Sequence, residues 1–178
     1  MNFAPFLKYS SVFVETGTCR GDGLAAALAA GFTTIKSVEA SKDYYIFANN
    51  RFRNNKEVTI YYGKSFDRLP EMIAGIPCPS VFFLDAHPAG PNTAGHDELM
   101  NGDKEWDQHN ILIKELDIIT SDGPHVILID DMNNWHNTRE YTNLLDEVYP
   151  DTYTYQLIDD VRPDITYKEK VLVCLPVL

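Results

Sequence analysis

Short apolar runs alternate with amphipathic segments along this chain, and glycine, proline or acidic residues mark most of the boundaries. The runs are rich in valine, isoleucine and phenylalanine, which at this length favours buried strands over helices. Helical patterns separate the first five runs, as is typical of a parallel sheet. The last two runs are joined too briefly for a crossover helix, so they should form an antiparallel hairpin. We therefore predict seven strands, over residues 12–14, 35–39, 58–62, 80–84, 125–129, 153–158 and 170–176.

Apolar residues at helical spacing predict helices between these strands. Asp22 is placed to cap the first helix, and Gly31 is placed to end it. In the second helix, Tyr44, Tyr45 and Phe47 are interpreted as core residues rather than as a surface for stacking. Strands that alternate with helices indicate an α/β fold, a single doubly wound domain over residues 1–178. The predicted helices cover residues 24–30, 41–52, 66–73, 109–121 and 138–149.

Residues 88–108 form a long connection after the fourth strand and have no helical or strand period. Connections of this length are uncommon inside compact domains and usually serve as lids or binding loops. We expect a lid over the reacting groups, within an acceptor loop that spans residues 86–108. Trp106 either covers a ring of the acceptor or packs the loop onto the body of the protein.

The composition agrees with one globular domain, because 44% of the 178 residues are hydrophobic. No apolar run approaches the roughly 20 residues that span a membrane, and no secretory signal is visible. Three widely spaced cysteines, Cys19, Cys78 and Cys174, indicate free thiols rather than a disulfide framework or a zinc site. We therefore expect a cytoplasmic protein that has no membrane partner.

Acidic residues dominate the charge balance, with 26 Asp and Glu against 15 Lys and Arg and a formal net charge of −11. A nucleic-acid partner is not expected, because binding to a phosphate backbone depends on clustered basic residues. The local basic cluster of Arg51, Arg53 and Lys56 is interpreted as the solvated face of a helix. An acidic site instead suits a cationic cofactor, a metal ion or a neutral small-molecule acceptor.

Acidic residues also stand at the carboxyl ends of the predicted strands. In open α/β sheets, ligands bind outside these ends. Aspartate is common in turns and helix caps, which would explain one or two of these positions but not the whole set. The sequence therefore predicts a binding site along this edge of the sheet, lined by Glu15, Glu39, Asp85, Asp130 and Asp131.

The segment E-T-G-T-C-R-G-D-G, residues 15–23, joins the first strand to the first helix. Its glycines allow a tight turn, and the N–H groups at the helix N-terminus favour an anionic group such as a carboxylate. Glu39 stands where an acidic residue holds ribose hydroxyls in nucleotide-binding α/β folds. The spacing is not G-x-G-x-x-G, so a nucleoside-type ligand is favoured over a nicotinamide cofactor. The alternative is an ordinary turn that contains glycines.

Asp85, Asp130 and Asp131 would repel one another at neighbouring strand ends unless a cation lies among them. Oxygen ligands select Mg²⁺, Ca²⁺ or Mn²⁺. Successive side chains of a strand point to opposite faces, so Asp130 and Asp131 can reach one ion only if the strand has already ended. The sequence leaves both a divalent metal site and a metal-free cluster open.

The order and spacing of these motifs, from residue 12 to residue 178, resemble those of class I S-adenosylmethionine (SAM)-dependent methyltransferases. The E-T-G-x-x-R-G form of the first motif is similar to that of macrocin-type O-methyltransferases, which methylate sugar hydroxyls. This resemblance implies a Rossmann-like, mostly parallel seven-stranded sheet and SAM as the cofactor. By position it implies cofactor contacts at Glu15, Thr16, Gly17, Thr18, Arg20, Gly21, Asp22, Glu39, Ala40, Gly63, Ser65 and Asp85.

Two of these cofactor contacts have alternatives. Family members have an acidic residue near the adenine amine where this chain has Lys64, so Ser65 is either the replacement contact or a helix cap. Arg20 either pairs with the methionine carboxylate or forms a salt bridge with Glu15 or Asp22.

The resembling sugar O-methyltransferases hold a divalent metal on one Asp after strand four and on an Asp pair after strand five. These positions correspond to Asp85, Asp130 and Asp131, and the resemblance makes Asp85 a catalytic residue as well. The general base of the family corresponds to a position where this chain has His87. Histidine titrates near neutral pH and can accept a proton in that role.

The other histidines have weaker claims. His96 and His109 are alternates for the base, and His109 is equally explained as a residue of a helix N-terminus. His125 and His136 are interpreted as structural.

The resulting hypothesis is a SAM-dependent O-methyltransferase, assisted by a divalent cation such as Mg²⁺, that acts on a hydroxyl of a sugar, glycan or similar polyol. Acceptor recognition is expected from later loops or from a second subunit of a homodimer. One alternative is a metal-dependent hydrolase or hydroxylase-like enzyme that uses Asp85, His87 and Asp130 as ligands. Another is a non-catalytic nucleotide-binding module.

Overall fold

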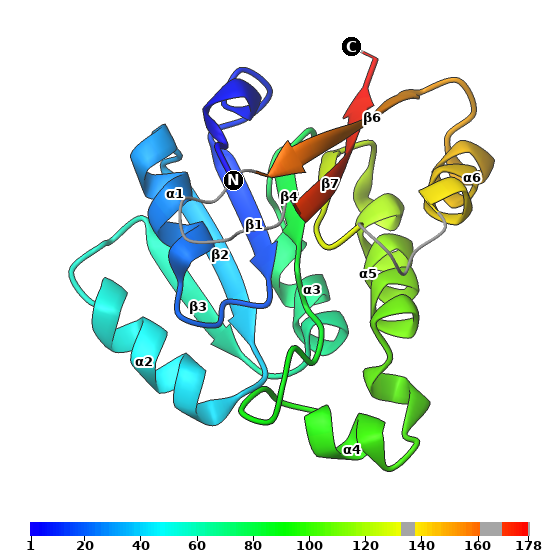
Figure 1. Cartoon of the computed structure of the whole chain (residues 1–178). Helices are drawn as coiled ribbons and strands as arrows, with labels where there is room; N and C mark the ends of the chain where they lie inside the picture. Colours follow the sequence, from blue (N-terminus) through cyan, green and yellow to red (C-terminus); the bar gives the residue numbers. More distant parts are fainter. Residues whose placement is uncertain (133–137, 161–168, 178) are drawn as a thin grey trace.

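A computed structural model describes residues 1–132, 138–160 and 169–177 of the chain. Its centre is a seven-stranded sheet in the order β3-β2-β1-β4-β5-β7-β6 (Figure 1). The first five strands are parallel, and β7 runs antiparallel to both β5 and β6. The strands are β1 (Val12–Thr16), β2 (Thr34–Glu39), β3 (Val58–Tyr62), β4 (Val81–Leu84), β5 (Val126–Ile129), β6 (Tyr153–Asp160) and β7 (Glu169–Pro176).

Helices cover both faces of this sheet, which confirms the predicted doubly wound, Rossmann-like architecture. On one face, Phe3, Leu24 and Phe52 pack against the sheet in one apolar cluster. On the other face, Leu69 and Leu116 belong to a second cluster. The helices are η1 (Ala4–Phe6), α1 (Asp22–Ala30), α2 (Lys42–Phe52), α3 (Ser65–Ile73), α4 (His96–Met100), η2 (Lys104–Trp106), α5 (Gln108–Asp122) and α6 (Thr138–Val148).

The strands differ in how deeply they are buried, because helices cover the centre of the sheet more fully than its edge. Every residue of β1, β4 and β5 is buried, as expected for central parallel strands with helices on both faces. The edge strand β3 is only partly buried. The β6–β7 hairpin pairs Tyr153 with Pro176 and Asp160 with Glu169, so the predicted antiparallel edge is confirmed.

The helix N-termini differ from the predicted caps. The N-cap of α1 is Gly21, in the left-handed region, and Asp22 is already the first helical residue. The Asp22 carboxylate instead pairs with Arg51, 2.7 Å away. Ser65 is likewise the first residue of α3, and Lys64 is the N-cap. The cap interpretation of Ser65 is therefore wrong.

The aromatic residues of α2 are less buried than predicted. Ala48 and Phe52, one helical turn apart, form the buried face, so Phe47 lies on the other side and is 52% exposed. Tyr45 packs instead against Tyr62 of the edge strand, with 5.2 Å between ring centroids. The interpretation of Phe47 as a core residue is wrong.

Residues 88–108 contain regular structure that the sequence pattern did not reveal. The helix α4 and the short helix η2 lie beyond the carboxyl ends of the parallel strands (Figure 1). The Trp106 ring packs so closely on Gly95 that a Cβ there would come within 2.0 Å of it. The segment is therefore folded onto itself, and its role as a lid stays a prediction.

None of the helices in the described ranges combines the length and apolarity needed to cross a membrane.

We predict that replacement of Gly17 with alanine costs more stability than the same change at Gly75. Both glycines have positive φ angles, 84° and 74°, so each substitution pays about 1–2 kcal/mol for the left-handed conformation. At Gly17 the new Cβ would also lie 2.3 Å from the Asp85 carbonyl oxygen, whereas at Gly75 it meets nothing within 4 Å. Urea unfolding of both variants measures the difference, and equal losses would contradict the close packing of Gly17 on Asp85.

Candidate active site

A cavity of about 1170 Å³ opens at the carboxyl ends of the parallel strands. The turns after β2 and β3 supply Glu39, Ala40, Gly63 and Ser65 to its wall. The segments after β4 and β5 supply Asp85, His87, Asp130 and Asp131, and α5 and α6 supply His109, Glu140 and Tyr141. Because the strand order is β3-β2-β1-β4-β5, these groups follow one another across the cavity. The volume is somewhat above the range of about 300–1,000 Å³ that is typical of small-molecule sites.

Glu39 fastens the glycine-containing loop to the end of β2. Its two carboxylate oxygens accept hydrogen bonds from the backbone N–H groups of Cys19 and Ser41, each at 2.7 Å. Burial raises the pKa of Glu39, and these backbone donors partly offset that effect. The carboxylate therefore lies at the cavity wall with its position already set.

Glu15 is buried beneath the loop and does not line the cavity. The Ser37 hydroxyl donates to Glu15 Oε2 at 2.6 Å, and the hydroxyl oxygens of Ser37 and Thr18 lie 2.6 Å apart. Burial raises the pKa of Glu15 to about 8, although the Ser37 bond opposes the shift. A Cβ on Gly23 would lie 1.8 Å from Glu15 Oε1, so the side chain fills the space that this glycine leaves. Glu15 supports the loop from below.

The remaining predicted cofactor residues divide into three groups. Gly17, Gly63, Ser65, Ala40 and Asp85 line the cavity together with Glu39. Thr16 and Thr18 are buried under the loop, beside Glu15. The last group, Arg20, Gly21 and Asp22, is not part of the cavity wall: Arg20 and Asp22 are exposed, and Gly21 packs on the Phe52 ring.

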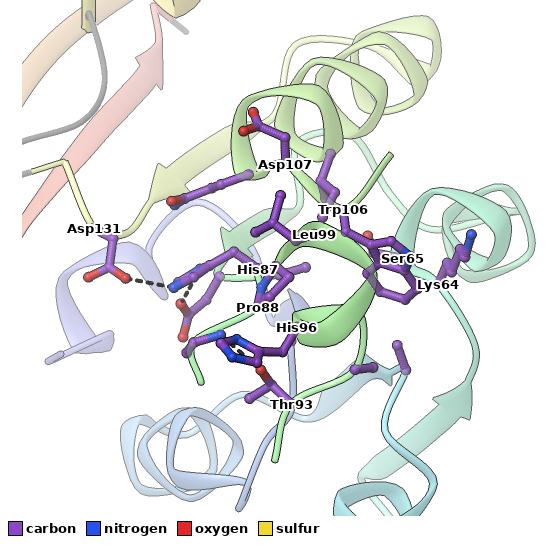
Figure 2. Close-up of a pocket in the computed structure, with 18 of the residues that line it drawn as sticks. Lys64, Ser65, His87, Pro88, Thr93, His96, Leu99, Trp106, Asp107 and Asp131 are labelled. Atoms are coloured by element: carbon purple, nitrogen blue, oxygen red, sulfur yellow. Dashed lines mark hydrogen bonds and ion pairs between the residues drawn. The ribbon is translucent and has the colours of Figure 1, made fainter. Parts of the chain in front are cut away.

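His87 and two aspartates form a close group of polar side chains in the cavity wall. His87 Nε2 lies 2.9 Å from Asp131 Oδ2, and His87 Nδ1 lies 3.7 Å from Asp85 Oδ1 (Figure 2). Strand β5 ends at Ile129 and Asp131 has a φ of 57°, so Asp130 and Asp131 are released from strand alternation. The sequence analysis predicted that Asp130 and Asp131 could reach one ion only if the strand had already ended before them.

One ligand atom from each of Asp85, His87 and Asp131 lies within 4.8 Å of the others, which is close enough to share a metal ion. Asp130, the third metal ligand in the prediction, instead accepts a hydrogen bond from the Asp131 backbone N–H at 2.9 Å. A set of one imidazole and two carboxylates suits Mn²⁺ or Zn²⁺ better than Mg²⁺, which prefers oxygen. The group fits a divalent cation, but with His87 in the place of Asp130.

Lys64 ties the segment of residues 104–106 to the turn after β3. Its Nζ lies 2.8 Å from Glu105 Oε2 and 4.8 Å from the centroid of the Trp106 ring. The bond from Lys64 lowers the pKa of Glu105. Figure 2 shows Lys64, Ser65 and Trp106 together, across the cavity from His87 and Asp131. Trp106 both lines the cavity and packs on Gly95, so the two predicted roles are compatible.

A second polar cluster lies where α5 and α6 meet. His109 Nδ1 is 3.2 Å from the hydroxyl of Tyr141, and His109 Nε2 is 3.6 Å from Glu140 Oε1. Burial raises the pKa of Tyr141 to about 12. The sequence analysis did not identify Glu140 or Tyr141, because both fall on an ordinary amphipathic helix.

The other histidines have different surroundings. His96 lies beside Thr93 in the cavity wall (Figure 2). His125 is buried, accepts a hydrogen bond from the Ser80 N–H at 3.0 Å and contacts Asp122, which agrees with a structural role. Burial lowers the pKa of His125. His136 lies outside the described residues.

The sequence analysis also missed Glu115 of α5. It is fully buried, and its Oε2 accepts a hydrogen bond from the Thr16 hydroxyl at 3.2 Å. The available signal was its spacing, because Glu115 falls in register with the buried residues Leu112 and Ile119 of the same helix.

We predict that Glu15 makes the protein less stable as the pH rises from about 5 to 9. The folded chain keeps the Glu15 proton up to a pKa of about 8, whereas the unfolded chain loses it near 4.5. Below pH 4.5, Glu15 is protonated in both the folded and the unfolded chain. Between pH 4.5 and about 8 only the folded chain keeps the proton, so the free energy of unfolding decreases as the pH rises. One such group contributes at most about 1.4 kcal/mol per pH unit.

Denaturant unfolding at several pH values checks this prediction with Glu15→Gln, which imitates the protonated side chain. The stability of the wild type relative to this variant should fall across the window. The exposed Glu147 provides the control, and Glu147→Gln should follow the wild type. A constant difference between wild type and Glu15→Gln would show that Glu15 does not titrate in this range.

No protein-family model matches the sequence, and no curated protein matches it either. The structure is similar to a candidate O-methyltransferase from Klebsiella pneumoniae, with a TM-score of 0.62 and 15% identity over 96% of this chain and 75% of that one. It is also similar to the O-methyltransferase from Bacillus cereus in complex with S-adenosylhomocysteine (SAH), with a TM-score of 0.60 and 16% identity over 97% and 79% of the two chains. Cofactor-bound Rv0187 from MTB has a TM-score of 0.60 and 15% identity over 98% and 78%. These likenesses show that the chain has the Rossmann-like fold of class I SAM-dependent methyltransferases.

Proposed function

We propose that this protein is a SAM-dependent O-methyltransferase. The observation that carries the proposal is the single cavity that joins Gly17 and Glu39 to the group of Asp85, His87 and Asp131. A methyltransferase needs a cofactor site and a proton acceptor in one enclosed space, so that the acceptor oxygen can approach the methyl group in line. The fold, shared with solved structures that contain SAH, supports the same conclusion.

Glu39 and the loop around Gly17 would hold SAM. A carboxylate at the end of β2 is suited to the ribose hydroxyls, and the turn residues Gly63 and Ser65 lie beside it for the adenine. SAM, when bound, supplies a methyl group already activated on a positively charged sulfur. The carboxylates of Asp85 and Asp131 favour a positive charge in this part of the cavity.

His87 is the proposed proton acceptor. With the Nε2 proton directed at Asp131, the lone pair of the imidazole is on Nδ1, which is buried and has no hydrogen-bond partner among the described residues. Asp131 would thus fix both the tautomer and the orientation of the ring, as a carboxylate does for a histidine base in other enzymes. A hydroxyl acceptor could then lose its proton to Nδ1 as the new bond forms, once the groups that cover this nitrogen move to admit it.

The acceptor is proposed to be an uncharged hydroxyl compound such as a sugar, a glycan or another polyol. The wall of the cavity contains Asp107 and Glu140 in addition to the aspartates near His87, so a phosphorylated acceptor would be repelled. Among the described residues, Lys64 is the one lysine or arginine that lines the cavity, and it is paired with Glu105. A sugar nucleotide is therefore a poorer candidate than a neutral sugar.

A divalent cation is a further element of the proposal. Asp85, Asp131 and His87 would hold it, and its charge would stabilise the oxygen anion that develops on the acceptor. A cation bound through the imidazole would remove His87 from the role of base. Removal of metal from the purified protein can therefore distinguish the two arrangements.

Calorimetric titration with SAH is the first test of the proposed function. We expect one molecule of SAH to bind per chain, and Glu39→Gln to weaken binding by about 10-fold to 100-fold, because hydrogen bonds to a charged acceptor are worth about 1.5–3 kcal/mol. Glu57 precedes β3 at the opposite end of the sheet, so Glu57→Gln is the matched control and should bind SAH normally. A wild-type protein that does not bind SAH would refute the proposal.

We also predict that His87→Gln lowers methyl transfer by at least about 100-fold while SAH affinity is retained, as is typical when a general base is removed. His87→Asp should recover part of the activity, because a carboxylate can also accept the proton. The assay uses a radiolabelled methyl donor with neutral sugars, glycans and polyols, and with sugar nucleotides as the anionic comparison.

Chelation separates the two roles of His87 in the same assay. If EDTA abolishes transfer and Mn²⁺ restores it, the three residues hold a metal. If EDTA has no effect, His87 acts with Asp131 alone. An unchanged rate in His87→Gln would exclude both roles.

A further inference from the structure

Glu115 is a buried carboxyl group on the helix that follows the lid segment. It lies in the middle of α5, among apolar residues that pack on the sheet, and has no exposed surface. Its Oε2 accepts the Thr16 hydroxyl, but its Oε1 is buried and has no hydrogen-bond partner within the described ranges. A buried polar atom without a partner costs about 1–3 kcal/mol. A leucine at this position would avoid that cost but would leave the Thr16 hydroxyl without its acceptor.

The contacts of Glu115 connect it to the cofactor side of the cavity. The Thr16 Oγ1 atom that donates to Glu115 also accepts a hydrogen bond from the Asp85 N–H at 3.3 Å. The hydroxyl of Ser65, the first residue of α3, lies near enough to the Glu115 carboxyl to oppose the effect of burial on its pKa, without the geometry of a hydrogen bond to Oε1. One side chain therefore lies against the end of β1 and the start of α3, and reaches the end of β4 through Thr16.

These neighbours are the segments that form the proposed SAM site. Thr16 directly precedes Gly17, which packs on the Asp85 backbone and lines the cavity together with Asp85 and Ser65. A small displacement of Thr16 would move Gly17 and the Asp85 backbone together. The position of the reacting groups relative to the cofactor thus depends on a contact made from outside the cavity wall.

We propose that Glu115 is a positioning residue that fixes Thr16, and through it Gly17 and Asp85, in the geometry that binds the cofactor. This inference rests on the proposed methyltransferase function. Burial raises the pKa of Glu115 to about 8, so near neutral pH the side chain is mainly protonated. A neutral amide of the same shape should therefore replace it well.

Two substitutions at Glu115 and one control test the proposal. Glu115→Leu should weaken SAH binding about tenfold and raise the KM for SAM more than it lowers kcat. The melting temperature of the ligand-free protein should change little, because removal of the unpartnered oxygen offsets loss of the acceptor for the Thr16 hydroxyl. Glu115→Gln should keep SAH affinity within about threefold of the wild type.

The control is Thr120→Val. Thr120 is also buried on α5, but among the described residues its hydroxyl bonds only to carbonyls of its own helix, at Leu116 and Asp117. This variant should bind SAH as the wild type does. A merely structural role for Glu115 would instead lower the melting temperature in Glu115→Leu and leave SAH affinity unchanged, and that result would overturn the proposal.

Hydrogen exchange of the ligand-free protein gives a readout that does not depend on SAH. The Asp85 amide, which bonds to both the carbonyl and the hydroxyl of Thr16, should exchange faster in Glu115→Leu than in the wild type or Thr120→Val. If the Asp85 amide exchanges faster in Glu115→Leu but the wild type does not bind SAH, the methyltransferase function is refuted. The link from Glu115 to Asp85 is then still supported. Unchanged exchange in Glu115→Leu would overturn the inference.

Discussion

Carboxyl groups that lie near one another where the parallel strands end are the constraint on which the rest of this structure depends. A buried charge is unfavourable unless it is neutralised or well hydrogen-bonded, and neighbouring negative charges add to that cost. The chain resolves the problem differently at each position. Glu15 has a raised pKa beneath the loop, Glu39 accepts two backbone N–H groups, and Asp131 lies against His87. Each solution leaves a group of different chemical character at the same edge of the sheet.

The order of the strands turns these separate solutions into one site. Strand β1 lies between β2 and β4, so the loop around Gly17 contacts the end of β2 on one side and the Asp85 backbone on the other. The contact with Asp85 is so close that only a glycine fits. The groups suited to a cofactor and the groups suited to catalysis are therefore joined by backbone packing. A ligand that orders the loop would also order the reacting centre.

Most of the fold could be predicted from the sequence, because strand positions depend on short apolar runs that read directly as buried strands. The acidic residues of the site could be predicted for the same reason, since each directly follows or ends such a run. Side-chain direction could not. Asp131 adopts a left-handed backbone conformation just past β5, and this turns it toward His87 while Asp130 bonds to the backbone. Such a choice depends on tertiary packing and leaves no periodic signal.

Glu115 and Phe47 both show that burial cannot be predicted from residue type alone. A lone glutamate in an amphipathic helix is ordinarily a surface residue, yet Glu115 is buried because hydroxyls of neighbouring elements face it. Phe47 is an aromatic residue in a helix whose buried face is set by Ala48 and Phe52, so it is exposed in spite of its hydrophobicity. Composition and spacing describe what a residue prefers, whereas burial is decided by which face of the helix meets the sheet.

The geometry around His87 gives one further conclusion about how the site can work. The 2.9 Å contact between His87 Nε2 and Asp131 Oδ2 already engages one nitrogen of the imidazole ring. Under the proposed function, a cation held through Nδ1 could leave this contact in place, but the imidazole would then be a ligand and no longer a base. The two proposed roles of His87, metal ligand and proton acceptor, therefore exclude each other even though they use the same residues.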